Sequence, residues 1–313
     1  LYLFGAPDRT TGEGMNASPA WYDTQRDQDN VDLYASLPFS AGGRTHEAML
    51  GLMYSRQDFV SDRRVRVSVP PVGNFFAWDG SYPEPEWGSS ATYTTQDTTQ
   101  TGIYAATRLS VTDALTLILG SRITHWDAEG MRWNGSTLRI KHDQVVTPYA
   151  GVVYDIDSVY SAYASYTSIF NPQDYQDKNG DYLDPLEGDS YEVGLKAAYL
   201  DGRLNASAAI FQIEQDNLAQ TDGDNKIPGT NNAAYRAAEG ATSKGFEVEL
   251  SGALTDDWNL MLGWSQFQAE DAQGKRVNTR YPRRSATLFS TYRLQQLTVG
   301  GGVRTVEDVR RLL

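Results

Sequence analysis

Alternation of apolar and polar side chains at a period of two is the feature that most constrains this chain. It is clearest between Pro148 and Leu254. In one segment the apolar set is Tyr191, Val193, Leu195, Ala197 and Tyr199, and the intervening set is Ser190, Glu192, Gly194, Lys196 and Ala198. Successive side chains of a β-strand leave opposite faces of the sheet. The pattern therefore predicts strands with one apolar and one polar face.

The connections between these segments differ in length in a regular way. Short turns alternate with long polar stretches rich in Asn, Asp, Gly and Gln. The short turns centre near Gly42, Asp113, Asp157, Gly202, Asp256 and Gln296. This alternation is typical of a transmembrane β-barrel, which has short periplasmic turns and long outer loops, and it predicts about twelve complete strands and one remnant.

The long stretches are predicted to be irregular. The longest is Val60–Tyr93, which is rich in proline and aromatic residues. A loop of this length in a compact domain is usually functional, although it can also fold back on a small aromatic core of its own. The other predicted loops are Pro7–Asn30, Ala128–Gln144, Asn171–Gly188, Gln215–Thr242 and Asp271–Pro282.

Composition fits a barrel and leaves one alternative. The sequence contains no run of about 18 apolar residues, so no transmembrane helix is predicted. Barrel strands show lipid only alternate residues, so their average hydropathy stays low. Aromatic residues make up 12% of the chain, including 19 Tyr, which suits interfacial girdles of a barrel. A Tyr-rich soluble β-sandwich or sugar-binding surface would also account for them.

Several classes of function are disfavoured. The net charge of −13 argues against nucleic acid as a partner, because nucleic-acid binding needs a basic stripe. The chain has no cysteine for disulfides or thiolate metal sites. His46, His125 and His142 are expected to be solvated and not to bind a metal. Carboxylate pairs such as Glu247 and Glu249 arise readily by chance among 40 acidic residues, and no nucleophile elbow or phosphate loop occurs. No catalytic residue is predicted, and the chain is not expected to be an enzyme.

Three strings in fixed order carry a family resemblance. They are TPYAGVVYDIDSVYSAYASYTSIFNPQ, PLEGDSYEVGLK and DGRL, and the hairpins that follow match as well. The chain resembles the TonB-dependent outer-membrane receptors from Leu1 to about Arg304. Within them it is most similar to the ferric siderophore receptors of the ferripyoverdine, coprogen and ferrichrome kind.

The resemblance implies an all-β fold, a transmembrane antiparallel β-barrel with short periplasmic turns and long extracellular loops. Family barrels have about 22 strands and a plugged lumen. We therefore expect residues 1–304 to form a partial barrel domain that lacks the plug and the closing strands. Residues 305–313 are expected to be a divergent tail whose pattern suits a short helix.

The implied function is that of a receptor and transporter for a ferric siderophore in the bacterial outer membrane. A TonB-type protein would energise transport through the missing N-terminal region, and outer-membrane lipid would surround the barrel. No cofactor or protein-bound metal is expected, because the siderophore itself holds the iron. An anionic ligand would meet Arg276, Arg280 and Arg283, if these are not simply solvated.

Aromatic side chains in the outer loops are the candidate ligand contacts, because they offer flat apolar area with a polar edge. They are Trp78, Tyr82, Trp87, Trp126, Trp133, Phe170 and Tyr175. Each could equally be a girdle or loop-core residue. Two other hypotheses stay open: a porin-like or adhesin-like barrel, and a soluble all-β glycan-binding protein or hydrolase. Dependence on detergent would separate the barrels from the soluble protein.

Overall fold

The computed structural model describes residues 1–238, 240–277 and 281–307. Strands make up most of this part of the chain, together with a single turn of 3-10 helix at Phe75–Ala77. Among the described residues, no helix is long and apolar enough to cross a membrane.

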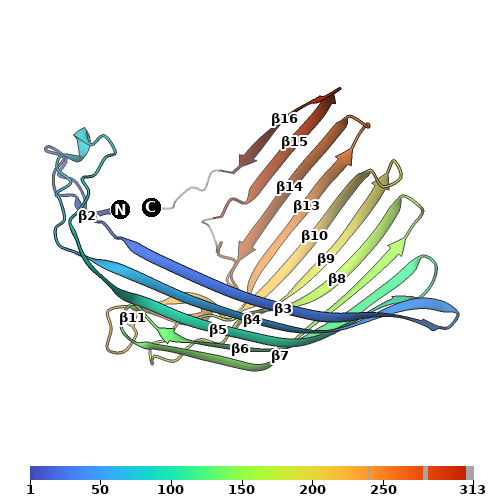
Figure 1. The fold of residues 1–313 in the computed structure, drawn as a ribbon, viewed down its shortest axis with the longest axis horizontal. Helices are drawn as coiled ribbons and strands as arrows, with labels where there is room; N and C mark the ends of the chain where they lie inside the picture. The colour runs from blue at the N-terminus through green and yellow to red at the C-terminus, as the bar shows by residue number, and fades with distance from the viewer. Residues whose placement is uncertain (239, 278–280, 308–313) are drawn as a thin grey trace. The chain divides into compact units, whose positions relative to one another are not determined.

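Twelve strands form the main sheet (Figure 1). They are β3 (Tyr22–Ala41), β4 (Arg44–Arg66), β5 (Trp87–Ser110), β6 (Leu115–Met131), β7 (Thr137–Asp155), β8 (Tyr160–Asn171), β9 (Leu186–Tyr199), β10 (Leu204–Asp216), β13 (Ala241–Ala253), β14 (Trp258–Glu270), β15 (Arg284–Leu294) and β16 (Leu297–Val306). Two small hairpins lie outside it: β1 (Tyr2–Phe4) with β2 (Asn16–Ser18), and β11 (Leu218–Lys226) with β12 (Ala233–Ala238).

The order of the strands in the sheet follows the sequence. It runs from β3 to β10 and then continues from β13 to β16, because β11 and β12 pair only with each other. The printed registers are all antiparallel, for example β9 with β10 and β10 with β13. Short turns alternate with longer connections along most of the chain, as predicted, but β6 and β7 are joined by residues 132–136 alone, where a long loop was expected.

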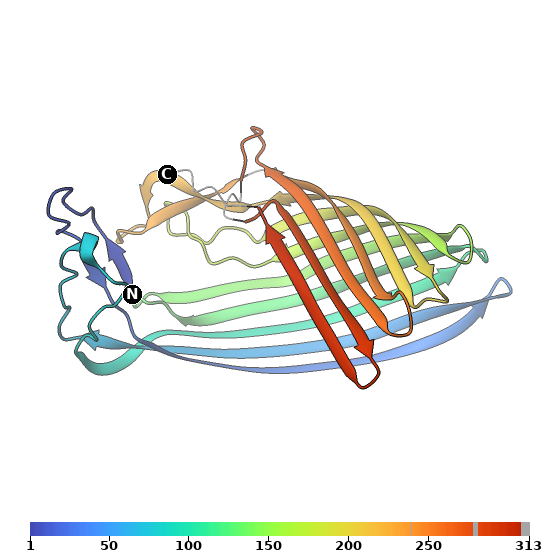
Figure 2. The ribbon, with the colours of Figure 1, turned by 90° about the horizontal axis from the view of Figure 1, so that it is seen from above.

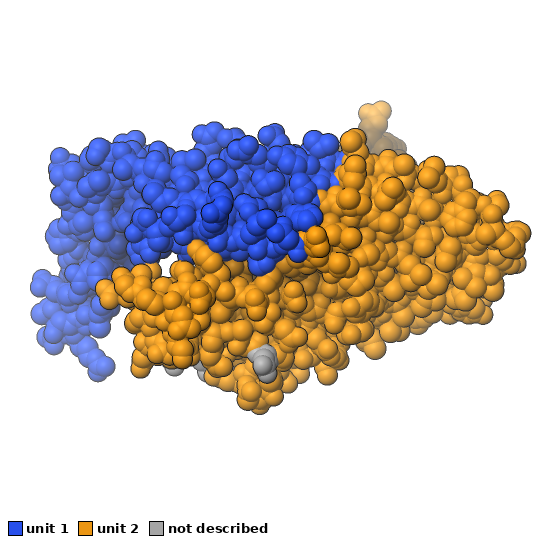
Figure 3. Space-filling model, turned by 90° about the horizontal axis from the view of Figure 1, so that it is seen from below, with its two compact units in different colours: residues 1–32, 53–101, 125–143 blue, residues 33–52, 102–124, 144–313 orange. Residues whose placement is uncertain are grey.

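The chain divides into two compact units, which Figure 3 colours separately. Unit 1 comprises residues 1–32, 53–101 and 125–143, and unit 2 comprises residues 33–52, 102–124 and 144–313. All six tight turns belong to unit 2, where β8 to β10 and β13 to β16 lie side by side (Figures 1 and 2). Unit 1 contains the polar parts of β3 to β7 and the longest irregular connection.

The apolar rows of unit 2 are exposed. Ile210 is 65% exposed, and Val193 and Leu195, on the neighbouring strand, are each 55% exposed. On the opposite face, Gly194 is buried and Glu192 is half-buried. A sandwich would bury such rows between two layers, so the prediction that they face outward is confirmed.

Aromatic rings lie over glycines on the polar face of unit 2. The ring of Tyr163 on β8 covers Gly194 on β9, and its hydroxyl donates a hydrogen bond to the Glu192 carboxylate. Phe211 on β10 covers Gly245 on β13 in the same way. The bare glycine backbone leaves room for the ring to lie flat against the sheet.

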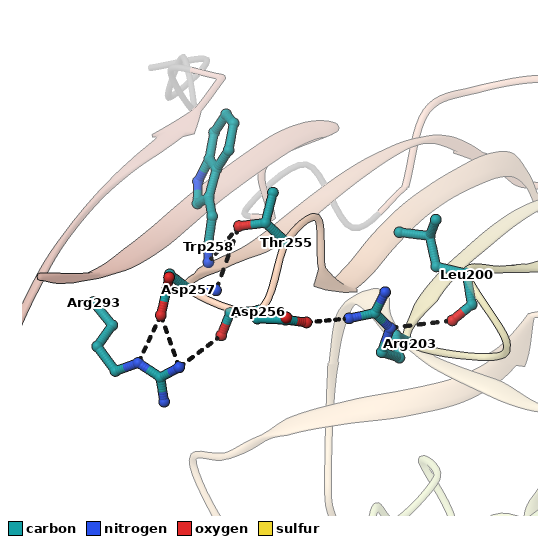
Figure 4. Close-up of polar contacts among 7 residues, drawn as sticks. All are labelled: Leu200, Arg203, Thr255, Asp256, Asp257, Trp258 and Arg293. Atoms are coloured by element: carbon teal, nitrogen blue, oxygen red, sulfur yellow. Dashed lines mark hydrogen bonds and ion pairs between the residues drawn. The ribbon is translucent and has the colours of Figure 1, made fainter. Parts of the chain in front are cut away.

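The tight turns are tied together by arginine–aspartate pairs (Figure 4). Arg203, in the β9–β10 turn, donates to Asp256 in the β13–β14 turn at 2.5 Å. Arg293, near the end of β15, donates to Asp257 at 2.7 Å. The four side chains are largely exposed, so each pair contributes about 1 kcal/mol at most.

Several predicted loop limits are wrong. Tyr22 already opens β3, so part of the predicted loop Pro7–Asn30 is strand; only residues 67–86 of Val60–Tyr93 and 132–136 of Ala128–Gln144 lie outside β4 to β7. The predicted loop Gln215–Thr242 contains the β11–β12 hairpin. The reason is common to all: these strand ends carry polar side chains on both faces, so period-two alternation disappears although backbone pairing continues.

The predicted tail is described only in part. Thr305 and Val306 belong to β16, which therefore extends past the predicted limit at residue 304. Residues 308–313, where the helix was expected, lie outside the described residues. The tail's helix stays a prediction.

Candidate ligand-binding site

The seven predicted aromatic residues divide between the two units. Trp78, Tyr82, Trp87, Trp126 and Trp133 belong to unit 1, and Phe170 and Tyr175 belong to unit 2. Four lie in connections, as expected, but Trp87 opens β5, Trp126 lies within β6 and Phe170 lies within β8. The description of these three as loop residues was therefore wrong. For Trp87 the reason is that β5 begins in polar sequence without apolar alternation, whereas Trp126 and Phe170 lie just before the predicted loops Ala128–Gln144 and Asn171–Gly188.

Trp87 takes part in an aromatic–arginine cluster of unit 1. Its ring meets the edge of Trp21, with ring centroids 5.8 Å apart and planes at 83°. The guanidinium of Arg64 on β4 lies 4.4 Å from the Trp21 ring centre, and Arg64 is 3.8 Å from the Asp23 carboxylate. Because β4 lies between β3 and β5 in the sheet, the cluster joins the ends of three strands.

A second cluster comes from the same three strands. Arg63 on β4 lies 5.8 Å from the ring centre of Tyr22 and 5.2 Å from that of Tyr93. The two tyrosine rings are 5.4 Å apart. Arg63 and Arg64 are neighbours in β4, so their side chains leave opposite faces of the sheet. The Arg63–Arg64 and Trp21–Tyr22 pairs were both missed as site residues.

Trp78 and Tyr82 are held within their own loop, which spans residues 67–86. Trp78 stacks on Phe75 at 5.8 Å and donates its indole N–H to the Ser81 carbonyl. Tyr82 donates its hydroxyl to the Pro70 carbonyl, and burial raises the pKa of that hydroxyl. The loop therefore has an aromatic core of its own, which was one of the two interpretations of this stretch.

Asp79 shapes the same loop. It accepts hydrogen bonds from the hydroxyl and the backbone N–H of Ser81, at 2.6 and 2.9 Å. These bonds favour the ionised carboxylate and lower the pKa of Asp79. Asn74 similarly accepts from the Phe76 N–H at the start of the 3-10 turn.

Trp126 and Trp133 differ in their surroundings. Trp126 lies against His142 on the neighbouring strand β7, with ring centroids 5.8 Å apart. Trp133 is in the β6–β7 turn and is 54% exposed. The Nδ1 atom of His125, on β6, lies 3.1 Å from a carboxylate oxygen of Asp143 on β7, within hydrogen-bond distance. Among the described residues, no group of three or more His, Asp or Glu side chains is arranged to hold a metal ion.

Tyr175 is the centre of an aromatic contact in unit 2. Its ring lies 4.4 Å from that of Tyr235 on β12, and the Tyr235 N–H donates to the Gln176 carbonyl at 2.9 Å. Tyr175 is nevertheless 43% exposed. These contacts attach the β11–β12 hairpin to the long β8–β9 connection and leave the Tyr175 side chain partly exposed.

The clusters are suited to binding rather than to chemistry. Arginine stacked on aromatic rings offers flat area and a positive charge together, which fits a planar or anionic ligand. The residues missed from the sequence are Trp21, Tyr22, Arg63, Arg64 and Tyr235. One signal was visible in the sequence, namely the adjacent aromatic and adjacent arginine pairs, but which strands bring these pairs together depends on the register.

Comparison with known proteins gives one consistent result. The family described as TonB dependent receptor-like, beta-barrel matches residues 2–311. The chain is 40% identical to the ferric-pyoverdine BN7/BN8 receptor of Pseudomonas putida, over 93% of this chain and 37% of that protein. It is 38% identical to the ferripyoverdine receptor of Pseudomonas aeruginosa, over 90% of this chain and 35% of that protein.

A solved structure agrees. The crystal structure of the ferripyoverdine receptor of the Pseudomonas aeruginosa outer membrane, bound to ferripyoverdine, has a TM-score of 0.79 and 35% identity, covering 90% of this chain and 38% of that one. The chain thus spans a little over a third of the length of the curated relatives it matches. With a family match over nearly every residue, this chain belongs to the TonB-dependent receptors, and its sequence is that of their β-barrel.

Proposed function

We propose that this chain is the barrel part of a receptor that binds a ferric siderophore at the outer face of the outer membrane and passes it inward. A TonB-type protein energises transport, and outer-membrane lipid surrounds the exposed apolar rows. The siderophore brings the iron already chelated, so neither a cofactor nor protein ligands to the metal are part of the proposal.

The observation that carries the proposal is the pair of aromatic–arginine clusters around Arg63 and Arg64. They lie where β4 and β5 meet the long connection of residues 67–86, not at a tight turn. Siderophores are bulky and polar and often carry planar chelating groups, which stack well on aromatic and guanidinium planes. Relatives at 38–40% identity are named as receptors for ferric pyoverdines, which supports this ligand class.

The predicted aromatic residues have different roles in the proposed binding site. Trp87, Trp133 and Tyr175 have ring area available to a ligand in their clusters or turns. Trp78 and Tyr82 act mainly by shaping their loop, because their polar atoms bond within it. Trp126 and Phe170 lie within strands and remain proposed contacts.

Tryptophan fluorescence provides the test. The purified protein in detergent, with its seven tryptophans, is titrated with a panel of ferric siderophores that includes ferric pyoverdines. Saturable quenching by one class is expected. Replacing Arg63 by Gln should weaken that binding about 5- to 30-fold, since the cation–π contacts of a half-buried arginine contribute about 1–2 kcal/mol.

Arg44→Gln is the matched control, because it removes the same charge at a tight turn of unit 2. It should leave the affinity unchanged. If no member of a broad panel quenches the protein, the siderophore proposal fails. Ion conduction without siderophore binding would instead favour a porin-like barrel.

A further inference from the structure

Positive charge is concentrated in one segment of this acidic chain. The connection between β14 and β15 and the first residue of β15 supply Lys275, Arg276, Arg283 and Arg284, while the whole chain has a net charge of −13. Arg280, also predicted as a ligand contact, lies outside the described residues.

The backbone holds Arg276 beside the end of β14. Arg276 forms an antiparallel bridge with Glu270, and the Val277 N–H donates to the Ala269 carbonyl at 3.0 Å. Asp271 closes the turn between them by accepting the Lys275 N–H at 2.8 Å. The position of Arg276 is therefore set by pairing with the strand.

Arg283 is held more tightly. Its guanidinium lies 5.0 Å from the ring centre of Phe267 and donates through Nη2 to the Val277 carbonyl. The Phe267 N–H in turn donates to the Arg283 carbonyl at 3.0 Å. The other terminal nitrogen, Nη1, is buried and has no hydrogen-bond partner among the residues that the structure describes. Burial, reinforced by Arg276, lowers the pKa of the Arg283 guanidinium.

A cavity of about 90 Å³ lies among these side chains. Its lining includes Phe267, Gln268, Arg276, Arg283, Arg284 and Glu307. Three arginines and one glutamate line the cavity, and Glu270 is near enough to act on Arg283 as well, so the positive groups still outnumber the carboxylates. An unpartnered buried donor beside such a cavity needs an acceptor, because a buried donor without a hydrogen bond is destabilising, and more so when the group is charged.

The ligand of this cavity comes from water and not from lipid. Phe267 pairs with Gly245, and Ser265 pairs with Glu247 two positions along, so Phe267 shares the polar face of the sheet. The exposed apolar rows are on the opposite face.

We propose that this cavity is an oxyanion site that binds a carboxylate or phosphate group of a water-borne ligand. Arg283 donates from the floor through Nη1, Arg276 donates from the rim, and Glu307 competes with the ligand for both. The site does not require the ligand to be a siderophore.

Citrate and inorganic phosphate are the probes, with equilibrium dialysis of the radiolabelled anion against the purified protein in detergent at constant chloride. One saturable site per chain is expected. Arg276→Gln should weaken binding about tenfold, because a charge-assisted hydrogen bond is lost. The matched control is Lys275→Gln, which makes the same charge change at a neighbouring exposed residue that does not line the cavity. It should have no effect.

Glu307→Gln should change the affinity for the anion in the opposite direction to Arg276→Gln. Removing the competing carboxylate should tighten citrate binding, which a merely structural role of Glu307 would not produce. The proposal is overturned if neither anion binds saturably to the unmodified protein, or if Arg276→Gln and Lys275→Gln weaken binding equally. Because this readout uses no siderophore, it can succeed or fail independently of the proposed transport function.

Discussion

On the polar face of unit 2, aromatic rings from a neighbouring strand pack directly against glycines. Tyr163 covers Gly194, and its ring also lies 4.7 Å from the Lys196 ammonium. Tyr104 covers Gly51 and Tyr149 covers Gly120 in the same manner. Each ring replaces the missing side chain of the glycine and shields the backbone of the sheet there.

Gly194 therefore should not tolerate a side chain. A Cβ at this position would lie 2.5 Å from the Tyr163 ring, which would have to move and give up its hydrogen bond to Glu192. Gly194→Val should lower the free energy of unfolding by about 1–3 kcal/mol, as overpacking usually does. Thermal unfolding of the protein in detergent measures the change.

Gly263 provides the control for this prediction. A Cβ there would meet no atom within 4 Å, and its backbone is not in the left-handed region. Gly263→Val should be neutral or slightly stabilising, because valine suits a strand. Equal destabilisation by both variants would mean that the ring over Gly194 has no specific role.

At the scale of the element, tight turns are predictable and strand lengths are not. The Asp201-Gly202 pair in the sequence predicts the β9–β10 turn. Both residues adopt positive φ, as does Leu200 before them. By contrast β4 and β5 have 23 and 24 residues, whereas about ten cross a bilayer. The remaining residues of β4 and β5 carry polar side chains on both faces of the sheet, so no periodic pattern in the sequence marks them as strand.

The β7–β8 turn depends on one carboxylate. Asp157 accepts the backbone N–H groups of Tyr160 and Val159, both at 2.8 Å, and these bonds lower its pKa. A carboxyl whose folded-state pKa is depressed stabilises the fold above its unfolded pKa, and this stabilisation is lost as pH falls through the folded value.

Asp157→Ala should accordingly lower the melting temperature in detergent at neutral pH. The difference from the unmodified protein should shrink as the pH falls below the ordinary aspartate range. Asp157→Asn keeps an uncharged acceptor, so it should retain part of the stability and lose the pH dependence. A difference that is constant between neutral and acid pH would show that the charge of Asp157 contributes nothing.

The candidate site is predictable only in its residue types. Aromatic side chains near long connections are visible in the sequence, and Trp87 and Tyr175 do form clusters. Their partners Trp21 and Tyr235 are 66 and 60 positions away in the chain (87 − 21 and 235 − 175). Such contacts follow from strand order and register, which local patterns do not encode.

At the scale of the whole molecule, the exposed apolar rows are the feature that family membership explains. Ile210 on β10 is flanked in register by Val193 on β9 and Phe246 on β13. All three are exposed. Such a surface would be a liability in water. TonB-dependent receptors reside in the outer membrane, which supports the proposal that lipid surrounds these rows.

Two lysine substitutions at adjacent positions test this orientation. Ile210→Lys puts a charge on the apolar face near the middle of β10, which should cost about 2–4 kcal/mol in the bilayer. Ala209→Lys puts the same charge on the polar face, directly opposite Glu247 in the register, where it is solvated and paired. We therefore expect Ile210→Lys alone to reduce the amount of folded protein recovered in outer-membrane fractions, as measured by heat-modifiable migration on gels. If Ala209→Lys is the more damaging of the two, then the faces have been assigned the wrong way round, because lipid would have to contact the side that carries Glu192 and Glu247.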